Sequence, residues 1–406
     1  MQRFDVPRVL AAEGISNFGS MLSRLAIPWL AALTLQATPL QMAALLVADV
    51  VSAAFASLWL GAWVDRSGKR KVMLITDAAR FVLLAFLAAV VWLERVSFAL
   101  LVMVAAASGV LTMGFELARS AWMAQRVPLE ELTRRNSQLS AVASVSETAA
   151  FALGGWLFQW LGAALALVVD GLSYALSALC LRGVSETQAV PGEAPARTGW
   201  RDFVGEALQG LRTVRDHAAL SALASIEALL AFCMALFGTS YMIYVSRDLG
   251  LPTGELGMIF ALGGLGALLG ASLAPWLGQR FGPGRTMAVG LAAMALGSAC
   301  IPMASGVGWL AIGWLVVHQI VGDAGHTVYS VHDRTVRQTA VPFELLARAD
   351  AGIRGIGQVA TLAGALAGGL IGDAFGTHSV LWLGVAAATA GCVLAWQRLS
   401  SPVSHS

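Results

Sequence analysis

Charged residues are scarce in this sequence. Lysine, arginine, aspartate and glutamate make up 12% of the 406 residues, whereas soluble globular proteins carry about 25%. Hydrophobic residues make up 57%. This composition excludes an ordinary soluble enzyme and a disordered chain, and it indicates a protein that crosses a membrane several times.

Other classes are excluded by what else is missing. The four cysteines lie far apart and form no CxxC pair, so neither a disulfide scaffold nor a metal or redox site is expected. The net charge of +2 argues against a nucleic-acid partner. No Gly-x-x-x-x-Gly-Lys-Ser/Thr loop occurs, so the chain is not an ATP-driven pump of the usual kind. We therefore expect no enzyme, no cofactor and no metal.

Twelve apolar stretches are long enough to cross the roughly 30 Å hydrocarbon core of a bilayer. Such stretches must be helices, because lipid offers no partner for the backbone polar groups. Their approximate bounds are residues 12–35, 39–64, 72–93, 97–118, 138–161, 163–181, 218–245, 252–277, 287–304, 307–330, 349–372 and 377–397.

Basic residues are concentrated in alternate connections between these stretches. With twelve spans, 21 of the 26 lysines and arginines fall on the side that holds both termini. The positive-inside rule predicts that this side is the cytoplasm. The first apolar stretch is too long for a cleavable signal peptide and lacks a cleavage site.

The two halves of the chain repeat each other at a constant offset of 214 residues. VPLEELTRRNSQ begins at Val127 and VPFELLARADAG begins at Val341. An even number of spans in each half makes this a parallel repeat. The polar segment 183–200 separates the halves, and an amphipathic helix is expected after it. We predict three parts: 1–182 and 217–406 as six-helix bundles, and 183–216 as a cytoplasmic linker with that helix.

A specific motif lies between the second and third spans, in the run Gly61-Ala-Trp-Val-Asp-Arg-Ser-Gly-Lys-Arg-Lys71. Here the sequence resembles the major facilitator superfamily. The resemblance implies an all-α membrane protein with twelve transmembrane helices in two pseudo-symmetric six-helix bundles and a substrate site near midplane between them. It also implies that the loop is a cytoplasmic gate that stabilises the outward-open state. The gate residues expected are Gly61, Asp65, Arg66, Gly68, Lys69 and Arg70.

For three of these gate residues the side chain itself suggests a physical role. Gly61 would permit close helix contact, Asp65 would pair with an arginine or a helix N-terminus, and Gly68 would permit a tight turn. The simpler alternative is that the basic cluster only sets the topology.

Within the superfamily, the chain is similar to the branch of the enterobactin exporter and the macrolide-efflux proteins. The similarity rests on Asn17-Phe-Gly-Ser, on Arg24-Leu-Ala-Ile-Pro-Trp29 and on Thr76-Asp-Ala-Ala-Arg80. It implies an antiporter in the bacterial inner membrane that exports a siderophore or contributes to multidrug resistance by efflux. The fifth span has Ala150-Phe151 where antiporters often have Gly-Pro, so a hinge at that point is not implied.

Polar residues inside the spans fall on helical stripes. Glu13, Asn17, Ser20 and Arg24 share one face of the first span, and similar stripes occur in spans five, ten and eleven. Charges in lipid usually face the bundle interior or a water-filled path, so these stripes predict a wet cavity. Aromatic residues at helical spacing are more often packing residues or interface anchors than ligand contacts, and Asp77 with Arg80 is interpreted as a structural ion pair.

Roles for these residues follow from their chemistry. A carboxylate in a low-dielectric cavity can bind and release a proton, as proton-coupled antiport requires. Glu147 and Glu227 are the first candidates, because neither has an evident basic neighbour along the chain, and Asp49, Glu13 and Asp323 come next. The candidates for contact with substrate are Asn17, Arg24, Trp29, Tyr241, His318, His326, Arg354 and Gln358.

The sequence thus predicts a secondary active transporter that works by alternating access. We expect a proton-coupled exporter of a siderophore or drug-like organic molecule, working as a monomer with protons and membrane lipid as its other partners. Two alternatives stay open at this stage: a lipid or lysolipid translocase of the same fold, and a membrane interaction protein that does not transport.

Overall fold

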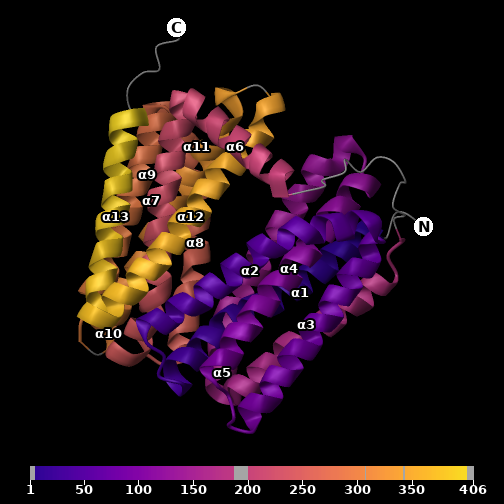
Figure 1. The fold of residues 1–406 in the computed structure, drawn as a ribbon. Coiled ribbons are helices and arrows are strands. Elements are labelled where there is room, and N and C mark those ends of the chain that lie inside the picture. Colours follow the sequence, from indigo (N-terminus) through magenta and orange to yellow (C-terminus); the bar gives the residue numbers. More distant parts are fainter. Residues whose placement is uncertain (1–4, 187–199, 307, 342, 400–406) are drawn as a thin grey trace. The chain divides into compact units, whose positions relative to one another are not determined.

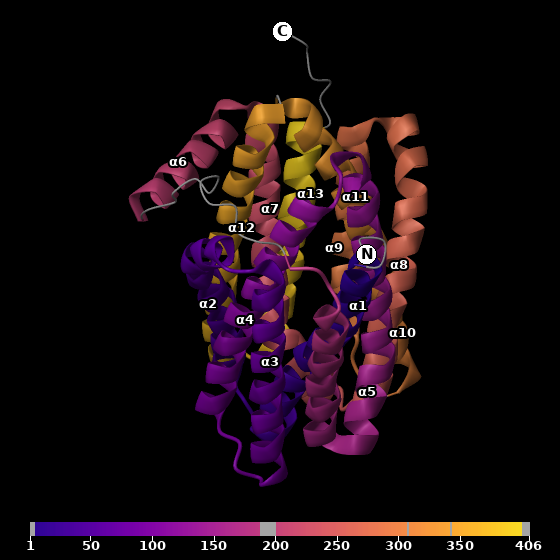
Figure 2. The ribbon, with the colours of Figure 1, turned by 90° about the vertical axis from the view of Figure 1, so that its right-hand side faces the viewer.

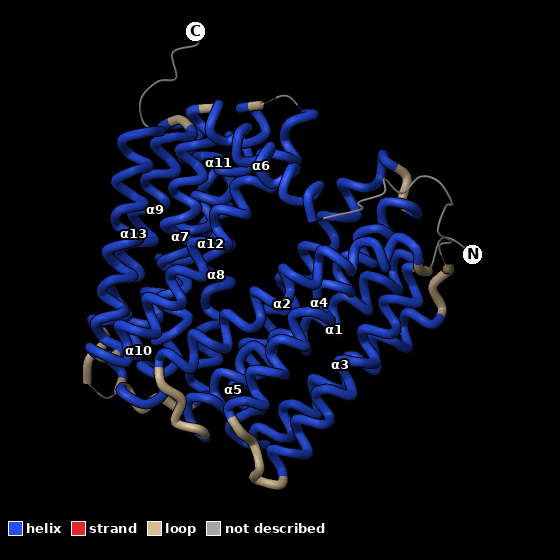
Figure 3. The backbone as a smooth tube through the Cα atoms, viewed as in Figure 1, coloured by secondary structure: helices blue, strands red, loops and turns tan. Residues whose placement is uncertain are grey.

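The computed structural model describes residues 5–186, 200–306, 308–341 and 343–399, apart from the side chains of a few residues within helices, Asp65 among them. In these ranges the chain is helical between short loops and contains no strand (Figure 3). The predicted all-α membrane fold is confirmed.

Five helices form the N-terminal half (Figure 1). α1 ends in a short π-helical segment, η2, and α5 is by far the longest helix, with 54 residues. Their bounds are α1 Asp5–Trp29, η2 Leu30–Thr34, α2 Pro39–Arg66, α3 Lys69–Trp92, α4 Phe98–Arg126 and α5 Leu129–Arg182.

α5 is two spans joined at Gly162. This residue has φ 78° and ψ 170°. Glycine adopts such a positive φ at little cost, whereas a residue with a Cβ rarely does. Helical residues precede and follow it, so the turn consists of little more than the glycine itself. The predicted spans 138–161 and 163–181 are therefore the two arms of a helical hairpin.

The C-terminal half contains eight α-helices and two π-helical segments. Within it, α7, α9 and α13 run side by side (Figures 1 and 2). The bounds are α6 Trp200–Asp216, α7 Ala218–Ile243, η3 Tyr244–Asp248, α8 Thr253–Phe281, α9 Pro283–Met303, α10 Trp309–Val317, η4 His318–Gly322, α11 Asp323–Ala340, α12 Phe343–Phe375 and α13 Thr377–Leu399.

Nine helices in the described ranges are long and apolar enough to cross a membrane. One of the nine, Ser137–Arg182, is the hairpin and supplies two crossings. α1 and the continuous run α10–η4–α11 are outside this set. α1 is interrupted by charged residues, and the pieces of the run are 9, 5 and 18 residues long. Counting these two with the ten crossings gives the twelve segments expected from the sequence.

The helices form two compact units. One comprises Met1–Ala37, Ala44–Arg197 and Pro252–Met258, and the other comprises Thr38–Ala43, Thr198–Leu251 and Ile259–Ser406. Each has an apolar core of its own. Trp122 and Met73 are buried in the first, where α1, α3 and α4 meet. Met287 and Leu223 are buried in the second, between α7, α9, α11 and α13.

A polar network is buried in the first unit. Asp77 and Arg80 of α3 form an ion pair at 2.6 Å, with 0% and 3% of their side chains exposed. Ser177 of the second arm of α5 donates to the other oxygen of Asp77 at 2.7 Å. The Arg80 guanidinium lies over the rings of Phe115, at 4.7 Å, and Tyr174, at 4.4 Å. Arg80 thus joins α3, α4 and α5, which agrees with the structural role expected for this pair.

A second buried carboxylate ties α1 to α5. Asp170 is fully buried and accepts a hydrogen bond from Ser23, and Ser173 donates to it at 3.5 Å. One turn of α1 away, the hydroxyl groups of Ser20 and Tyr174 are 3.0 Å apart. Asp170 therefore links α1 to the second arm of α5.

Replacing Asp77 with alanine leaves the Arg80 charge buried without a carboxylate. Removing one partner of a buried pair costs about 3–5 kcal/mol. We expect Asp77→Ala to lower the free energy of unfolding by about that amount, measured as a lower Tm of the protein purified in detergent. Lys71→Ala, on the exposed side of the same helix, is the control. Asp77→Leu with Arg80→Met should recover much of the loss, and a double variant as unstable as Asp77→Ala would contradict this role.

Candidate functional site

The turn between α2 and α3 holds the predicted gate motif. Lys69 is 1% exposed, and its Nζ donates to the carbonyl oxygens of Val64, at 2.7 Å, and Ser67, at 3.3 Å. A cation at this point satisfies the unpaired carbonyls at the end of α2. Arg66 is exposed, and the Asp65 side chain lies outside the described residues.

One expectation for the glycines of this motif, the tight turn at Gly68, is wrong. A Cβ at Gly61 would meet no described atom of its own unit within 4 Å, and the close helix contact expected there stays a prediction. Gly68 has φ −64° and ψ 125°, which any residue adopts, so the turn does not need glycine. A Cβ there would instead lie 2.6 Å from the Glu186 carboxylate, so the absence of a side chain makes room for Glu186.

Arg70 fastens the end of α5 to the motif. Its Nε donates to the carbonyl of Leu181 at 3.0 Å, and its terminal nitrogen donates to the carbonyl of Arg182 at 2.5 Å. Glu186, just beyond α5, accepts a hydrogen bond from the Arg70 backbone N–H at 3.1 Å, and Arg126 donates to its carbonyl. The motif therefore holds together the ends of α3, α4 and α5 within the first unit.

The polar stripe of α1 is divided between paired and unpaired residues. Glu13 forms an ion pair with Arg119 of α4, and Asn17 donates to the carbonyl of Ala143 in α5 at 3.1 Å. Arg24 is exposed and has no hydrogen bond or ion pair with any described residue. It lies near enough to Asp49 of α2 and Glu116 of α4 to interact with both charges. Three helices thus bring charged groups around Arg24.

Two other candidates of the first unit differ in their access to solvent. Trp29 is fully buried, with its ring 5.2 Å from that of Phe158, so it packs in the core. Its indole nitrogen has no hydrogen-bond partner in the described part of the chain. Glu147 is exposed in the first arm of α5 and is paired with no described residue.

Arg337 of α11 is the centre of an acidic cluster in the second unit. It contacts Asp333, one turn earlier, at 2.9 Å, Glu227 of α7 at 3.6 Å and Asp350 of α12 at 3.6 Å. Arg337 is 13% exposed, whereas Glu227 and Asp350 are each 35% exposed. One cation therefore balances three carboxylates from three helices, and Glu227, which has no basic neighbour along the chain, has one on the adjacent helix α11.

A cluster of polar and aromatic side chains lies where η4 meets α7, α8 and α9. The Tyr241 ring is 5.8 Å from Phe260 and 6.1 Å from His318. His318 Nδ1 is 3.1 Å from the carbonyl oxygen of Gly297, and Gln319 donates to Asp323 at 3.4 Å. The predicted site residues among them, Tyr241, His318 and Asp323, lie on α7, η4 and α11 of one unit.

The remaining candidates of the second unit, His326, Arg354 and Gln358, are exposed. Arg354 and Gln358 lie one turn apart on α12, downstream of Asp350 on the same helix. In the described residues, no group of three histidine, cysteine or acidic side chains could hold a metal ion.

Sequence reasoning missed Arg337, Asp333 and Glu186 as members of clusters. The spacing of Asp333 and Arg337, four residues apart on a helix, was a usable signal. Arg337 was counted instead as one of the basic residues that set the topology. Nothing in the local sequence placed Glu186 against the motif loop, because 116 residues separate it from Arg70.

Removing Arg337 should destabilise the second unit. Arg337→Met leaves three carboxylates together without a cation, and like charges in a region of low dielectric repel. We expect a loss somewhat below the about 3–5 kcal/mol typical of fully buried pairs, because Glu227 and Asp350 are partly exposed. Thermal unfolding in detergent measures it. Arg334→Met, exposed on the same helix, is the matched control, and equal Tm values for both variants would refute the central role of Arg337.

Comparison with known proteins places this arrangement in one family. The Major Facilitator Superfamily profile matches residues 9–349 and, in a second match, residues 223–406. The uncharacterised MFS-type transporter YfiS of Bacillus subtilis is 25% identical over 406 residues, covering 95% of this chain and 89% of that protein. The uncharacterised MFS-type transporter y4rN of Sinorhizobium fredii is 26% identical over 210 residues. This match covers 51% of this chain and 50% of y4rN.

Solved structures share the fold. A bacterial homologue of the iron transporter ferroportin superposes with a TM-score of 0.77 at 18% identity, covering 98% of both chains. A mutant of the nucleoside transporter NupG gives a TM-score of 0.76 at 14% identity, covering 98% of this chain and 100% of that one. At these identities the likeness concerns the fold alone.

Proposed function

Because the chain belongs to the Major Facilitator Superfamily, we propose that it is a secondary active exporter driven by protons. The chain is a multi-pass membrane transporter of the major facilitator fold, and its partner is a small molecule. The substrate proposed is a siderophore or a drug-like organic molecule. This choice rests on the similarity of residues 17–29 and 76–80 to the siderophore and macrolide exporters.

The ion pair between Glu227 and Arg337 supports proton coupling best. The two charges are 3.6 Å apart, on α7 and α11, and Glu227 keeps a third of its side chain exposed. A proton that binds Glu227 removes its charge and ends the attraction to Arg337. Arg337 then keeps its ion pairs with Asp333 of α11 and Asp350 of α12. Protonation thus redistributes the contacts between three helices of one unit.

Exposed groups in each unit support recognition of a polar substrate. Arg24 has no ion-pair partner among the described residues and suits an anionic group of the substrate. Arg354 and Gln358 offer a cation and an amide on adjacent turns of α12. Trp29, fully buried, does not serve as a stacking platform in this arrangement. The exposed Glu147 is the second proton carrier proposed.

The cellular setting is part of the same proposal. The basic residues favour an orientation with both termini in the cytoplasm, and the similarity to bacterial exporters favours the inner membrane. We propose that a single chain is the working unit, with residues 1–182 and 217–406 as its bundles. The gate role of the motif loop also remains a proposal, supported by the contacts of Lys69 and Arg70.

The substrate can be sought in cells that lack this gene. Medium and cell extract are compared by untargeted mass spectrometry, with and without the gene, under iron limitation. We expect one chelator to disappear from the medium and to accumulate inside the cell, because its exit is blocked. If both compartments are unchanged, the siderophore proposal is refuted, and drug-susceptibility and lipid-flipping assays decide between drug efflux and lipid translocation.

Proton coupling can be tested on the compound so identified. Glu227→Gln removes the titratable charge but keeps the shape, so export driven by a pH gradient in proteoliposomes should fall at least tenfold. Glu147→Gln is tested in parallel, and Glu94→Gln, in the loop between α3 and α4, is the control. Full pH-driven export by both Glu227→Gln and Glu147→Gln would exclude these carboxylates as proton carriers. Loss of folding is checked by the Tm of each variant.

A further inference from the structure

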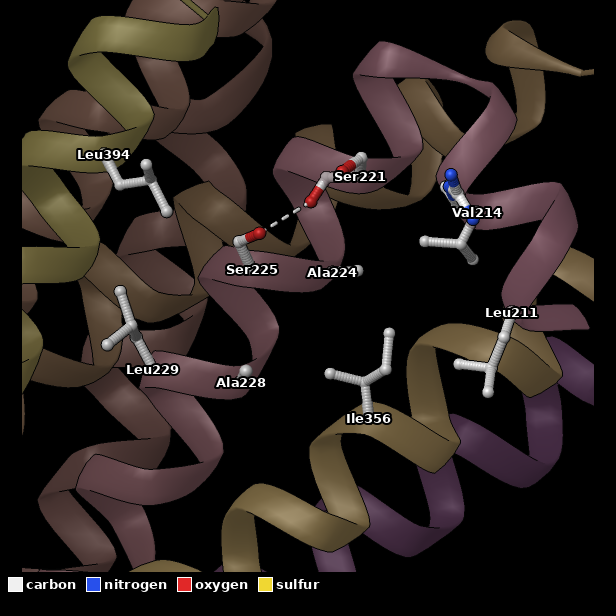
Figure 4. Close-up of a pocket in the computed structure, with 10 residues that line it drawn as sticks. Leu211, Val214, Ser221, Ala224, Ser225, Ala228, Leu229, Ile356 and Leu394 are labelled. Carbon is white, nitrogen blue, oxygen red and sulfur yellow. Dashed lines mark hydrogen bonds between the residues drawn. The ribbon is translucent and has the colours of Figure 1, made fainter. Parts of the chain in front are cut away.

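An apolar groove of about 530 Å³ lies on the second unit beside α6. Residues of α6, α7, α12 and α13 line it, among them Leu211, Ala228 and Ile356 (Figure 4). Its size falls in the range of roughly 300–1,000 Å³ that small-molecule sites occupy. The groove is separate from the Arg337 cluster, since none of the cluster residues lines it.

The groove exists because α6 is held against α12 by two glycines. A Cβ at Gly210 would lie 2.8 Å from the carbonyl oxygen of Arg348, and a Cβ at Gly352 would lie 2.7 Å from the backbone of Gly210. The backbones therefore touch at this crossing, as small residues allow in membrane proteins. Beyond the crossing, Val214 packs in the core with α7 and α12, so the position of α6 is fixed.

Small residues of α7 form the floor of the groove. Ala224, Ser225 and Ala228 of α7 line the groove together with Ile356 and Leu211 (Figure 4). The Ser225 hydroxyl donates to the carbonyl of Ser221 at 2.8 Å, so it is satisfied within its own helix. The wall thus offers a ligand almost nothing but hydrocarbon, and Leu229 and Leu394 extend it towards α13.

A positive charge stands at the edge of this apolar groove. Of the described residues that line it, Arg215 alone is charged. Arg212 lies one turn earlier on α6, and both arginines are exposed and make no ion pair with any described residue. Asp216, the last residue of α6, carries the nearest opposite charge along the chain. A hydrocarbon slot with an unpaired guanidinium at its rim matches a ligand with an acyl chain and an anionic headgroup.

We propose that this groove binds an anionic phospholipid of the bilayer. The acyl chain lies along Ala228, Leu229 and Ile356, and the phosphate accepts hydrogen bonds from Arg215. The groove opens beside α6, a helix too polar to be among the candidate membrane spans, and next to the first turns of α7, where a headgroup would be found. Basic residues at the ends of membrane helices bind anionic lipids in this way.

The glycine crossing and Val214 fix the position of α6, and the bound lipid would complete its packing against α7 and α12. In the groove the side chains of these helices do not touch one another. A lipid acyl chain that fills the groove would provide the missing contacts. α6 is followed directly by α7, the first long helix of the second unit. The lipid would therefore stabilise the junction between α6 and α7.

The test uses the full chain, purified and stripped of lipid, with phosphatidylglycerol or phosphatidylcholine added back and counted by native mass spectrometry. We expect phosphatidylglycerol to be retained more strongly. Arg215→Gln should weaken its retention about fivefold, since one basic residue near anionic lipid is worth about a factor of five. Arg212→Gln, on the same helix but outside the groove, is the matched control and should weaken it less.

Filling the groove tests the acyl-chain site separately. Ala228→Phe and, as a second variant, Ser225→Trp occupy the space from α7 and should abolish the difference between the two lipids while Tm stays within a few degrees. Unchanged retention of phosphatidylglycerol by both filled variants would overturn the proposal. So would equal retention of both lipids by the unmodified chain, or a dimer that Ala228→Phe dissociates, because the occupant would then be a second copy.

Discussion

A charge removed from water must find its partner within the protein, and this requirement organises both units. A protein interior offers few hydrogen-bond partners and little dielectric screening, so an unpaired charge buried there is costly. In the first unit, Arg80 satisfies Asp77 and stacks on the rings of α4 and α5. In the second, Arg337 satisfies carboxylates from α7, α11 and α12. In both units the pairing fixes which helices are neighbours, whereas apolar side chains would tolerate several arrangements.

The fold was largely predictable, because the hydropathy of a span and the 214-residue repeat are each carried by many residues at once. What the sequence could not provide was the partner of a polar residue on another helix, although it did predict the pair of Asp77 and Arg80 within α3. Glu227 and Arg337 are 110 residues apart, and only the packing of α7 on α11 joins them. The local pattern also misjudged Gly68, since a motif shows where a glycine occurs but not which atoms it approaches. Trp29 shows the same limit, because it lies on the face of α1 opposite to the polar stripe and is buried in the core.

The polar residues of the spans divide into those that stabilise and those left available. Asp77, Asp170 and Glu13 are engaged by neighbouring helices, so their chemistry is committed to structure. Arg24 and Glu147 are exposed and unpaired among the described residues, so they can act on something outside the protein. Glu227 belongs to both groups, because it is paired and still partly exposed. A group that must change its partner during a transport cycle needs this intermediate position.

The single-glycine turn at Gly162 has a consequence for the way this protein is made. The arms of α5 have no polar loop between them that could be carried across the membrane after the first arm is in place. An isolated first arm would also leave the backbone carbonyls at its end unsatisfied in a region of apolar residues. This connection suits entry of the two arms into the bilayer together, as one hairpin, and the residues of α5 that bond to α1 and α3 are synthesised after their partners.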